Sequence, residues 1–248
     1  ELIVDDIIEQ NQKQKLINFI DKWVKNKIDT VLKSLVDLKS LKEKNSLIKA
    51  LSYRLYENNG VLKRNEVSEY LKDLGQNERK ILRDLGVKFG RYHIFLYKLI
   101  KPEAVSLRTL LWKNYHQKNF NLRPPTFGLN FIDDKSFKNE SFMLLCGFEK
   151  FDNFFVRIDI LERLFVQIIN SIDEKDKNKE IKMIPEMLNL LGCNKENFKK
   201  LIKNMNYKII EKNNEVFFKY TPTKPKKISN KKTLKENPFD ILKNLNLN

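Results

Sequence analysis

Four lysine side chains are concentrated in one short segment near the C-terminal part of the chain. They are Lys195, Lys199, Lys200 and Lys203. On a helix, a spacing of four places like charges on one face and costs ~0.2–0.5 kcal/mol per pair. Glu196 can offset part of this repulsion, and a bound polyanion would relieve all of it while releasing counterions. The segment therefore favours a nucleic acid ligand, with an ordinary solvated lysine face as the open alternative.

A second segment, residues 85–112, mixes basic side chains with aromatic rings. Its basic residues of interest are Lys88, Arg91, Lys98, Lys101 and Arg108. Its rings include Phe89, Tyr92, His93 and Tyr97. Basic groups interleaved with stackable rings suit single-stranded RNA or DNA, whose unstacked bases contact aromatic side chains. The alternative is that the apolar rings belong to the core and only the charges are exposed.

Two glycines in this segment carry structural predictions. Gly86 follows an apolar helical pattern, so we expect it to end that helix in the left-handed conformation. Gly90 interrupts a β-favouring run, which indicates a bulge or a close backbone approach. The pair does not form a phosphate-binding loop, because the spacing is one residue short and Arg91-Tyr92 replaces the required Lys-Ser/Thr. We therefore expect no ATP hydrolysis by this chain itself.

The residues that usually bind metals or act as nucleophiles are few and scattered. The chain has two cysteines, Cys146 and Cys193, and two histidines, His93 and His116. No C-x-x-C or H-x-x-x-H spacing exists, so neither a zinc site nor another metal site is expected. No nucleophile with an adjacent activating base is visible either. The sequence therefore predicts no catalytic site and no cofactor, and the isolated cysteines fit a reducing compartment.

The overall charge favours anionic partners. Lys and Arg total 48 against 32 acidic residues, a formal net charge of +16 over 248 residues. Such a charge affects association rather than fold, and nucleic acid and acidic membrane surfaces are the usual partners. No apolar run approaches the ~20 residues that a membrane-spanning helix needs, and no signal peptide is visible. Because Lys, Asn and Ile are all abundant, a compositional bias is the alternative explanation.

The apolar periodicity predicts a mostly helical chain in four parts. Residues 1–118 form a helical bundle with one short extended insertion, and 119–155 form a connector whose likeliest strand is 142–148. Residues 156–220 contain three helices and then a hairpin that turns at Lys212-Asn213-Asn214, which is the order of a winged helix. Residues 221–248 form a basic linker and a short amphipathic anchor. Within the bundle, residues 12–38 carry one apolar stripe and are expected to form a single long helix.

Several phrases of the sequence resemble a known family. They are GVKFGRYHIFL and LRTLLW within residues 85–112, VRIDILERL at 156–164, MLNLLGC at 187–193 and NPFDIL at 237–242. This wording resembles the C-terminal accessory region of alphaproteobacterial helicase-related proteins, which are similar to the superfamily-two RNA helicase of the mitochondrial degradosome. The resemblance implies that ATP and Mg²⁺ serve motor domains outside this chain. It also implies a cytoplasmic location in a bacterium, or the mitochondrial matrix in a eukaryote.

Three hypotheses for function follow. The leading one is a nucleic-acid-binding accessory region of a degradosome-type RNA helicase, which holds RNA or another single strand beside motor domains in cis. Its expected contacts are the lysines and arginines named above together with Lys212 in the predicted hairpin turn. The second is a stand-alone winged-helix DNA-binding protein, and the third is a scaffold that docks a protein such as a nuclease. None of the three involves a membrane, and the chain starts at Glu1 rather than Met, as a part of a longer protein would.

Overall fold

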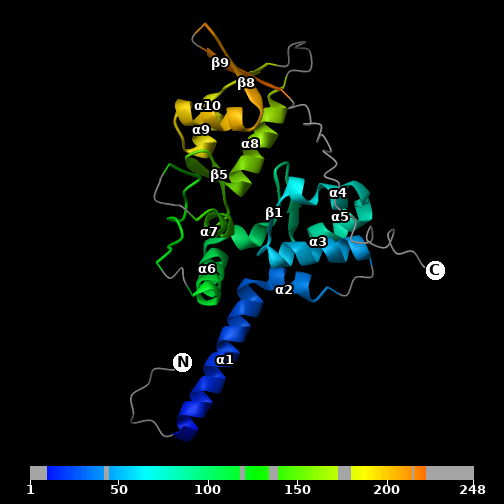
Figure 1. The fold of residues 1–248 in the computed structure, drawn as a ribbon, viewed down its shortest axis with the longest axis vertical. Coiled ribbons are helices and arrows are strands. Elements are labelled where there is room, and N and C mark those ends of the chain that lie inside the picture. The colour runs from blue at the N-terminus through cyan, green and yellow to red at the C-terminus, as the bar shows by residue number, and fades with distance from the viewer. Residues whose placement is uncertain are drawn as a thin grey trace, which may run out of the picture.

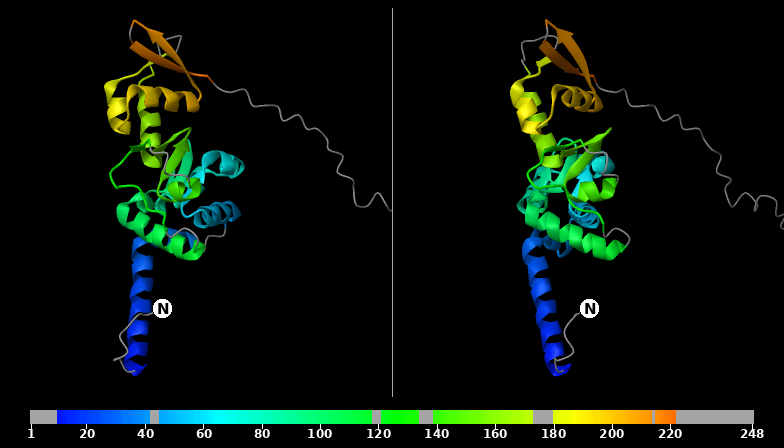
Figure 2. Two further views of the ribbon diagram at one scale, coloured as in Figure 1. Left: turned by 60° about the vertical axis from the view of Figure 1, so that its left-hand side comes forward. Right: turned by 90° about the vertical axis from the view of Figure 1, so that its left-hand side faces the viewer.

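The computed structural model describes residues 10–41, 45–117, 121–133, 139–172, 180–213 and 215–221. These residues are mostly helical, with three small antiparallel sheets of three strands each. The elements follow one another along an elongated body. Helix α1 (Gln10–Val31) projects from one end of this body, and the hairpin of β8 (Tyr207–Lys212) and β9 (Glu215–Tyr220) lies at the other (Figures 1 and 2).

The first unit, residues 46–96, is built around a sheet with the order β1-β3-β2. Strand β3 is central and antiparallel to both neighbours, with Phe95 opposite Val61 on one side and Lys88 on the other. The extended insertion predicted here is the pair β2–β3, whereas β1 was not predicted. The elements are α3 (Ser46–Glu57), β1 (Val61–Lys63), the 3-10 helix η1 (Arg64–Val67), α4 (Ser68–Asp73), α5 (Gln76–Asp84), β2 (Val87–Phe89) and β3 (His93–Leu96).

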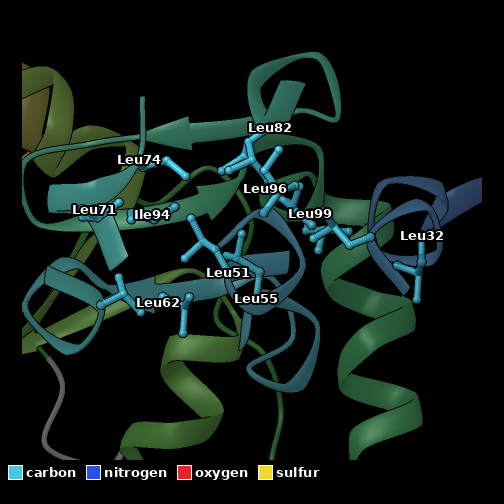
Figure 3. Close-up of a cluster of buried hydrophobic side chains, with 14 of the residues drawn as sticks. Leu32, Leu51, Leu55, Leu62, Leu71, Leu74, Leu82, Ile94, Leu96 and Leu99 are labelled. Carbon is cyan, nitrogen blue, oxygen red and sulfur yellow. The ribbon is translucent and has the colours of Figure 1, made fainter. Parts of the chain in front are cut away.

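Leucine side chains from the helices and the sheet form the core of this unit. Leu51 and Leu55 of α3 are fully buried beside side chains from β1, β3 and α5 (Figure 3). Burying each such side chain contributes about 1.5–3 kcal/mol. Two local signals set the boundaries as predicted. Asn45 caps α3 by accepting from the backbone N–H of Leu47 at 2.9 Å, and Gly86 follows α5 with φ +91°.

The expected single helix over residues 12–38 is wrong. The chain forms α1 and then a separate α2 (Lys33–Lys39), with a bend at Leu32. Leu32 is buried, and the bend lets Leu38 of α2 join the core of the first unit, where α2 packs against α3. The apolar stripe alone could not show this, because a bent helix and a straight helix have the same periodicity.

The middle unit, residues 102–157, begins with α6 (Pro102–His116), which has Pro102 at its first position as predicted. The strand expected over residues 142–148 is wrong. Asn139 instead caps a short helix by accepting from the backbone N–H of Phe142 at 2.9 Å, and Gly147, with φ +87°, ends the turn before the next strand. The remaining elements are β4 (Phe131–Ile132), α7 (Glu140–Leu145), β5 (Phe148–Phe151) and β6 (Phe154–Arg157), with sheet order β4-β6-β5.

The last unit, residues 158–220, has its own core and sheet, in the order β7-β9-β8. Asn194 caps α10 by accepting from the backbone N–H of Asn197 at 2.8 Å, and Gly192 ends α9 with φ +69°. The predicted hairpin is confirmed, with Tyr207 opposite Tyr220. The elements are α8 (Ile158–Asn170), β7 (Ile181–Lys182), α9 (Pro185–Leu191), α10 (Lys195–Asn204) and the hairpin β8–β9.

The first and last units have the same order of elements. In each, a helix, a strand, two helices and a hairpin follow one another, and the third strand lies at the centre of the sheet. The middle unit has the same strand order, with one helix rather than two among the described residues between its first two strands. The basic linker and anchor predicted for residues 222–248 lie outside the described residues.

Candidate nucleic-acid interface

A groove of about 1140 Å³ lies between the first unit and helices α8 and α9 of the last unit. Its basic side chains are Arg64, Lys88, Arg91 and Arg163, and its rings are Phe89, Phe95, Tyr97 and Phe165. Lys88 and Arg91 are exposed, and the guanidinium of Arg91 lies 5.7 Å from the ring centre of Phe165. The groove therefore combines cationic groups with aromatic and aliphatic walls, as the sequence predicted for Lys88 and Arg91.

The electrostatic environment of the groove is positive around Arg64. Burial lowers the pKa of Arg64 below its ordinary value, and the nearby charges of Arg79 and Arg91 lower it further. The side chain of Arg64 also donates to the backbone carbonyl of Gly90 at 2.7 Å. Arg64 thus holds the β2–β3 loop while adding its charge to the groove wall.

A carboxylate from the last unit fixes this same loop. Glu162 of α8 accepts from three successive backbone N–H groups, those of Arg91, Tyr92 and His93, at 2.5, 2.8 and 2.9 Å. A Cβ atom on Gly90 would lie 2.2 Å from the Cδ of Glu162. The close approach predicted at Gly90 is therefore confirmed, and the approaching group is a side chain from a distant helix.

His93 connects all three units through a cluster that we call the junction cluster: His93, Glu149, Glu162 and Lys63. The imidazole of His93 is buried, with Nε2 3.2 Å from Glu149 and Nδ1 3.6 Å from Glu162. Burial lowers the pKa of His93, but the hydrogen bonds to both carboxylates outweigh this and raise it above its ordinary value. Lys63 pairs with Glu149 at 2.7 Å, so two cationic groups can balance two carboxylates here.

The hydrogen bonds of the junction cluster also act on Glu149. Burial raises the pKa of this carboxyl, while hydrogen bonds from His93 and Lys63 lower it by more, so the net direction is down. Because β3, β5 and α8 each supply a member, the cluster ties the first unit to the middle and last units. It positions the loop that carries Arg91 at the groove.

The lysine face of α10 lies in the last unit, on the side opposite its buried residues Phe198, Leu201 and Ile202. The spacing predicted a helix face, and the structure places these lysines on one. Lys195, Lys200 and Lys203 are exposed and form no ion pair with any described residue. Together they present three free positive charges beside the β8–β9 hairpin.

Two other lysines of the predicted site are already paired. Lys199 contacts Glu196 at 3.2 Å and Glu211 of β8 at 2.7 Å, so its charge is largely balanced by carboxylates. Lys212 pairs with Glu180 at 2.7 Å and lies 6.0 Å from the ring centre of Phe217. Neither side chain is as free to contact a phosphate as the three exposed lysines of α10.

The remaining predicted contacts divide into exposed and buried side chains. Lys98 and Lys101 are exposed, and Lys101 lies over the ring of Tyr97 at 5.1 Å. Arg108 is 2% exposed and donates to the carbonyls of Asn59 and Leu99. The prediction that Arg108 contacts nucleic acid is therefore wrong, because its guanidinium is used inside the protein. Burial lowers its pKa to about 10.

Arg64 and Arg163 are groove residues that sequence reasoning missed. Arg163 is exposed on α8, in the register opposite the apolar stripe of that helix, and this register was a usable signal. Arg64 follows β1 directly, and nothing local distinguishes it from other surface arginines. Both reach the groove only through the packing of the last unit on the first.

The described residues offer no alternative chemistry. They contain no group of three or more His, Cys, Asp or Glu side chains that could hold a metal ion. Burial raises the pKa of the Cys146 thiol to about 12 and that of Cys193 to about 11, so both thiols are protonated near neutral pH. Among the helices of the described ranges, none has both the length and the apolar character to cross a membrane.

Comparisons with known proteins add no relative. No family model, no curated protein and no solved structure matches this chain. The resemblance to helicase accessory regions stays a prediction from the sequence.

Proposed function

We propose that this chain binds nucleic acid, and that its last unit does so as a winged helix. The order helix, strand, two helices and hairpin is that of a winged helix, a relative of the helix-turn-helix. In helix-turn-helix proteins the second helix of the pair enters the major groove of duplex DNA. Helix α10 has that place in the last unit, and α5 has it in the first.

The observation that carries this proposal is the set of three free lysines on α10. Lys195, Lys200 and Lys203 project from the helix that would enter the groove, next to a hairpin that carries an exposed Lys208. Contacts to phosphates supply most of the affinity of such proteins and make binding depend on salt. We therefore propose duplex DNA as the ligand of the α10 face.

The groove favours a second candidate, a single strand of RNA or DNA. Its basic side chains alternate with rings, including the exposed Tyr97 and the half-buried Phe165, and bases stack on such rings. This arrangement suits the helicase accessory region suggested by the sequence. In that case RNA would be the ligand, and the motor domains, ATP, Mg²⁺ and a nuclease would belong to partners of this chain.

Fluorescence anisotropy with labelled duplex DNA, single-stranded DNA and single-stranded RNA separates these candidates. A duplex of about two helical turns, ~20 base pairs, is long enough for two units to bind. We expect the triple variant Lys195→Glu, Lys200→Glu and Lys203→Glu to bind duplex at least about tenfold more weakly. The matched control changes Lys15, Lys22 and Lys25 of α1 to Glu, which alters the net charge equally and should have a much smaller effect.

Three outcomes decide between the candidates. Preference for duplex, lost in the α10 variant and kept in the control, supports the winged-helix proposal. Preference for a single strand, lost when Lys88 and Arg91 are changed to Glu, supports the groove as the binding site. Equal losses in the α10 variant and the α1 control would mean that binding follows net charge alone, and would overturn both.

A further inference from the structure

Helix α1 carries an exposed apolar face that no described residue covers. Phe19 is 66% exposed and Trp23 is 58% exposed, and Leu16 and Val24 are 37% exposed each. These positions, with the half-buried Ile17 and Ile20, fall on one side of the helix by their spacing. The helix projects from the body in all three views (Figures 1 and 2). A contiguous patch of this kind marks an interaction surface.

The charged side chains of α1 lie away from this face. At 100° per residue, Lys15, Lys22 and Lys25 fall on the opposite side of the helix. Near the body, Lys27 pairs with Glu103 of α6 at 2.5 Å, and the carboxylate of Glu103 stays 65% exposed. The apolar face therefore ends at a carboxylate that can accept a second cation.

The pattern of the face is symmetric about Ile20. Leu16 and Val24 are each four residues from Ile20, and Ile17 and Trp23 are each three residues from it. In an antiparallel pair of α1 helices centred on Ile20, Leu16 meets Val24 of the second copy and Ile17 meets Trp23. Two-fold symmetric interfaces require such a self-complementary surface, and Ile20 would then contact its own equivalent on the axis.

Charge complementarity also favours a second copy. The same register places Lys13 of one chain opposite Lys27 of the other, beside Glu103, whose carboxylate is bound to only one lysine among the described residues. The lysines on the outer side of α1 do not enter the contact. From this symmetry and this carboxylate we propose that α1 pairs antiparallel with α1 of a second copy of the chain. The inference does not depend on the nucleic acid proposal.

Sedimentation or light scattering of the full chain across a concentration series tests the pairing. We expect a mass that rises from 29.6 kDa to twice that value. The double variant Phe19→Glu with Trp23→Glu should remain a monomer throughout. The matched control, Asn18→Glu with Asn26→Glu, makes the same charge change on the polar side of α1 and should still dimerise.

A cysteine placed on the proposed axis gives a positive test of the register. Ile20→Cys should form a disulfide-linked dimer on mild oxidation, and Asn18→Cys and the unaltered chain should not. A monomer at every concentration without this cross-link would overturn the proposal, whether or not the chain then binds vesicles of phosphatidylserine or an acidic helix of another protein. A dimer unaffected by Phe19→Glu with Trp23→Glu would also overturn it, because another surface would then form the contact.

Discussion

Replacing Glu162 should loosen the attachment of the last unit to the first. Its carboxylate accepts three backbone N–H groups from the β2–β3 loop and lies 3.6 Å from the imidazole of His93. Hydrogen bonds to a charged group contribute about 1.5–3 kcal/mol each, but three bonds to one carboxylate do not add fully. We therefore expect Glu162→Ala to lower the free energy of unfolding by about 3–5 kcal/mol, as for other broken buried pairs.

The substitution Glu162→Gln should have a smaller effect. Oε1 of Glu162 accepts from Tyr92 and His93, whereas Oε2 accepts from Arg91. An amide can keep the first pair of bonds through its oxygen but loses the bond to Arg91 and the negative charge. We expect a loss of about 1–3 kcal/mol for this variant.

Urea unfolding followed by circular dichroism measures both values, and tryptic cleavage after Arg91 reports on the loop. The control is Glu186→Ala, since Glu186 also lines the groove but is exposed and forms no ion pair among the residues that the structure describes. We expect its effect to stay within about 0.5 kcal/mol. If Glu162→Ala costs less than about 1 kcal/mol, or no more than the control, the role assigned to the Glu162 carboxylate is refuted.

The remaining predictions concern three buried groups. Because the pKa of His93 is raised above 6.5 in the folded chain, its contribution to stability is full below about pH 6.5 and is lost as the pH rises through the folded value. The stability difference between the unaltered chain and His93→Gln, measured in urea at several pH values, should therefore shrink toward alkaline pH; a constant difference would argue against the ionised imidazole. Arg108→Met should lower the free energy of unfolding by about 2–5 kcal/mol, since two carbonyls lose their donor, and thermal melting checks this. Cys146 should react far more slowly than a free thiol with a thiol reagent at neutral pH, because burial raises its pKa to about 12, and equal rates would contradict its burial.

Local signals allowed much of the helical structure to be predicted. Asn45 and Asn194 cap their helices, Pro102 starts one, and Gly86 and Gly192 end others, because each of these effects depends only on neighbouring residues. The short outer strands could not be predicted in this way. Strand β1 has three residues and β7 has two, and each is stabilised by pairing with a strand far away in the sequence.

The candidate site shows the same division. Lys88 and Arg91 were found because their loop combines charge with rings, but the groove itself exists only where α8 and α9 pack on the first unit. The error at Arg108 had a visible warning, since Ala104, Val105 and Thr109 place it on the buried face of α6. A cationic residue on an apolar helix face is better interpreted as a donor to buried carbonyls than as a surface contact.

The salt dependence of duplex DNA binding tests the central proposal most directly. Each lysine–phosphate contact contributes about 0.9 to the slope of log affinity against log salt. If Lys195, Lys200 and Lys203 all contact phosphates, their replacement by Glu should reduce the slope by about 2.7, while the lysine variant of α1 should leave it nearly unchanged. An unaltered slope in the α10 variant, with binding retained, would contradict the proposal that this helix face contacts DNA.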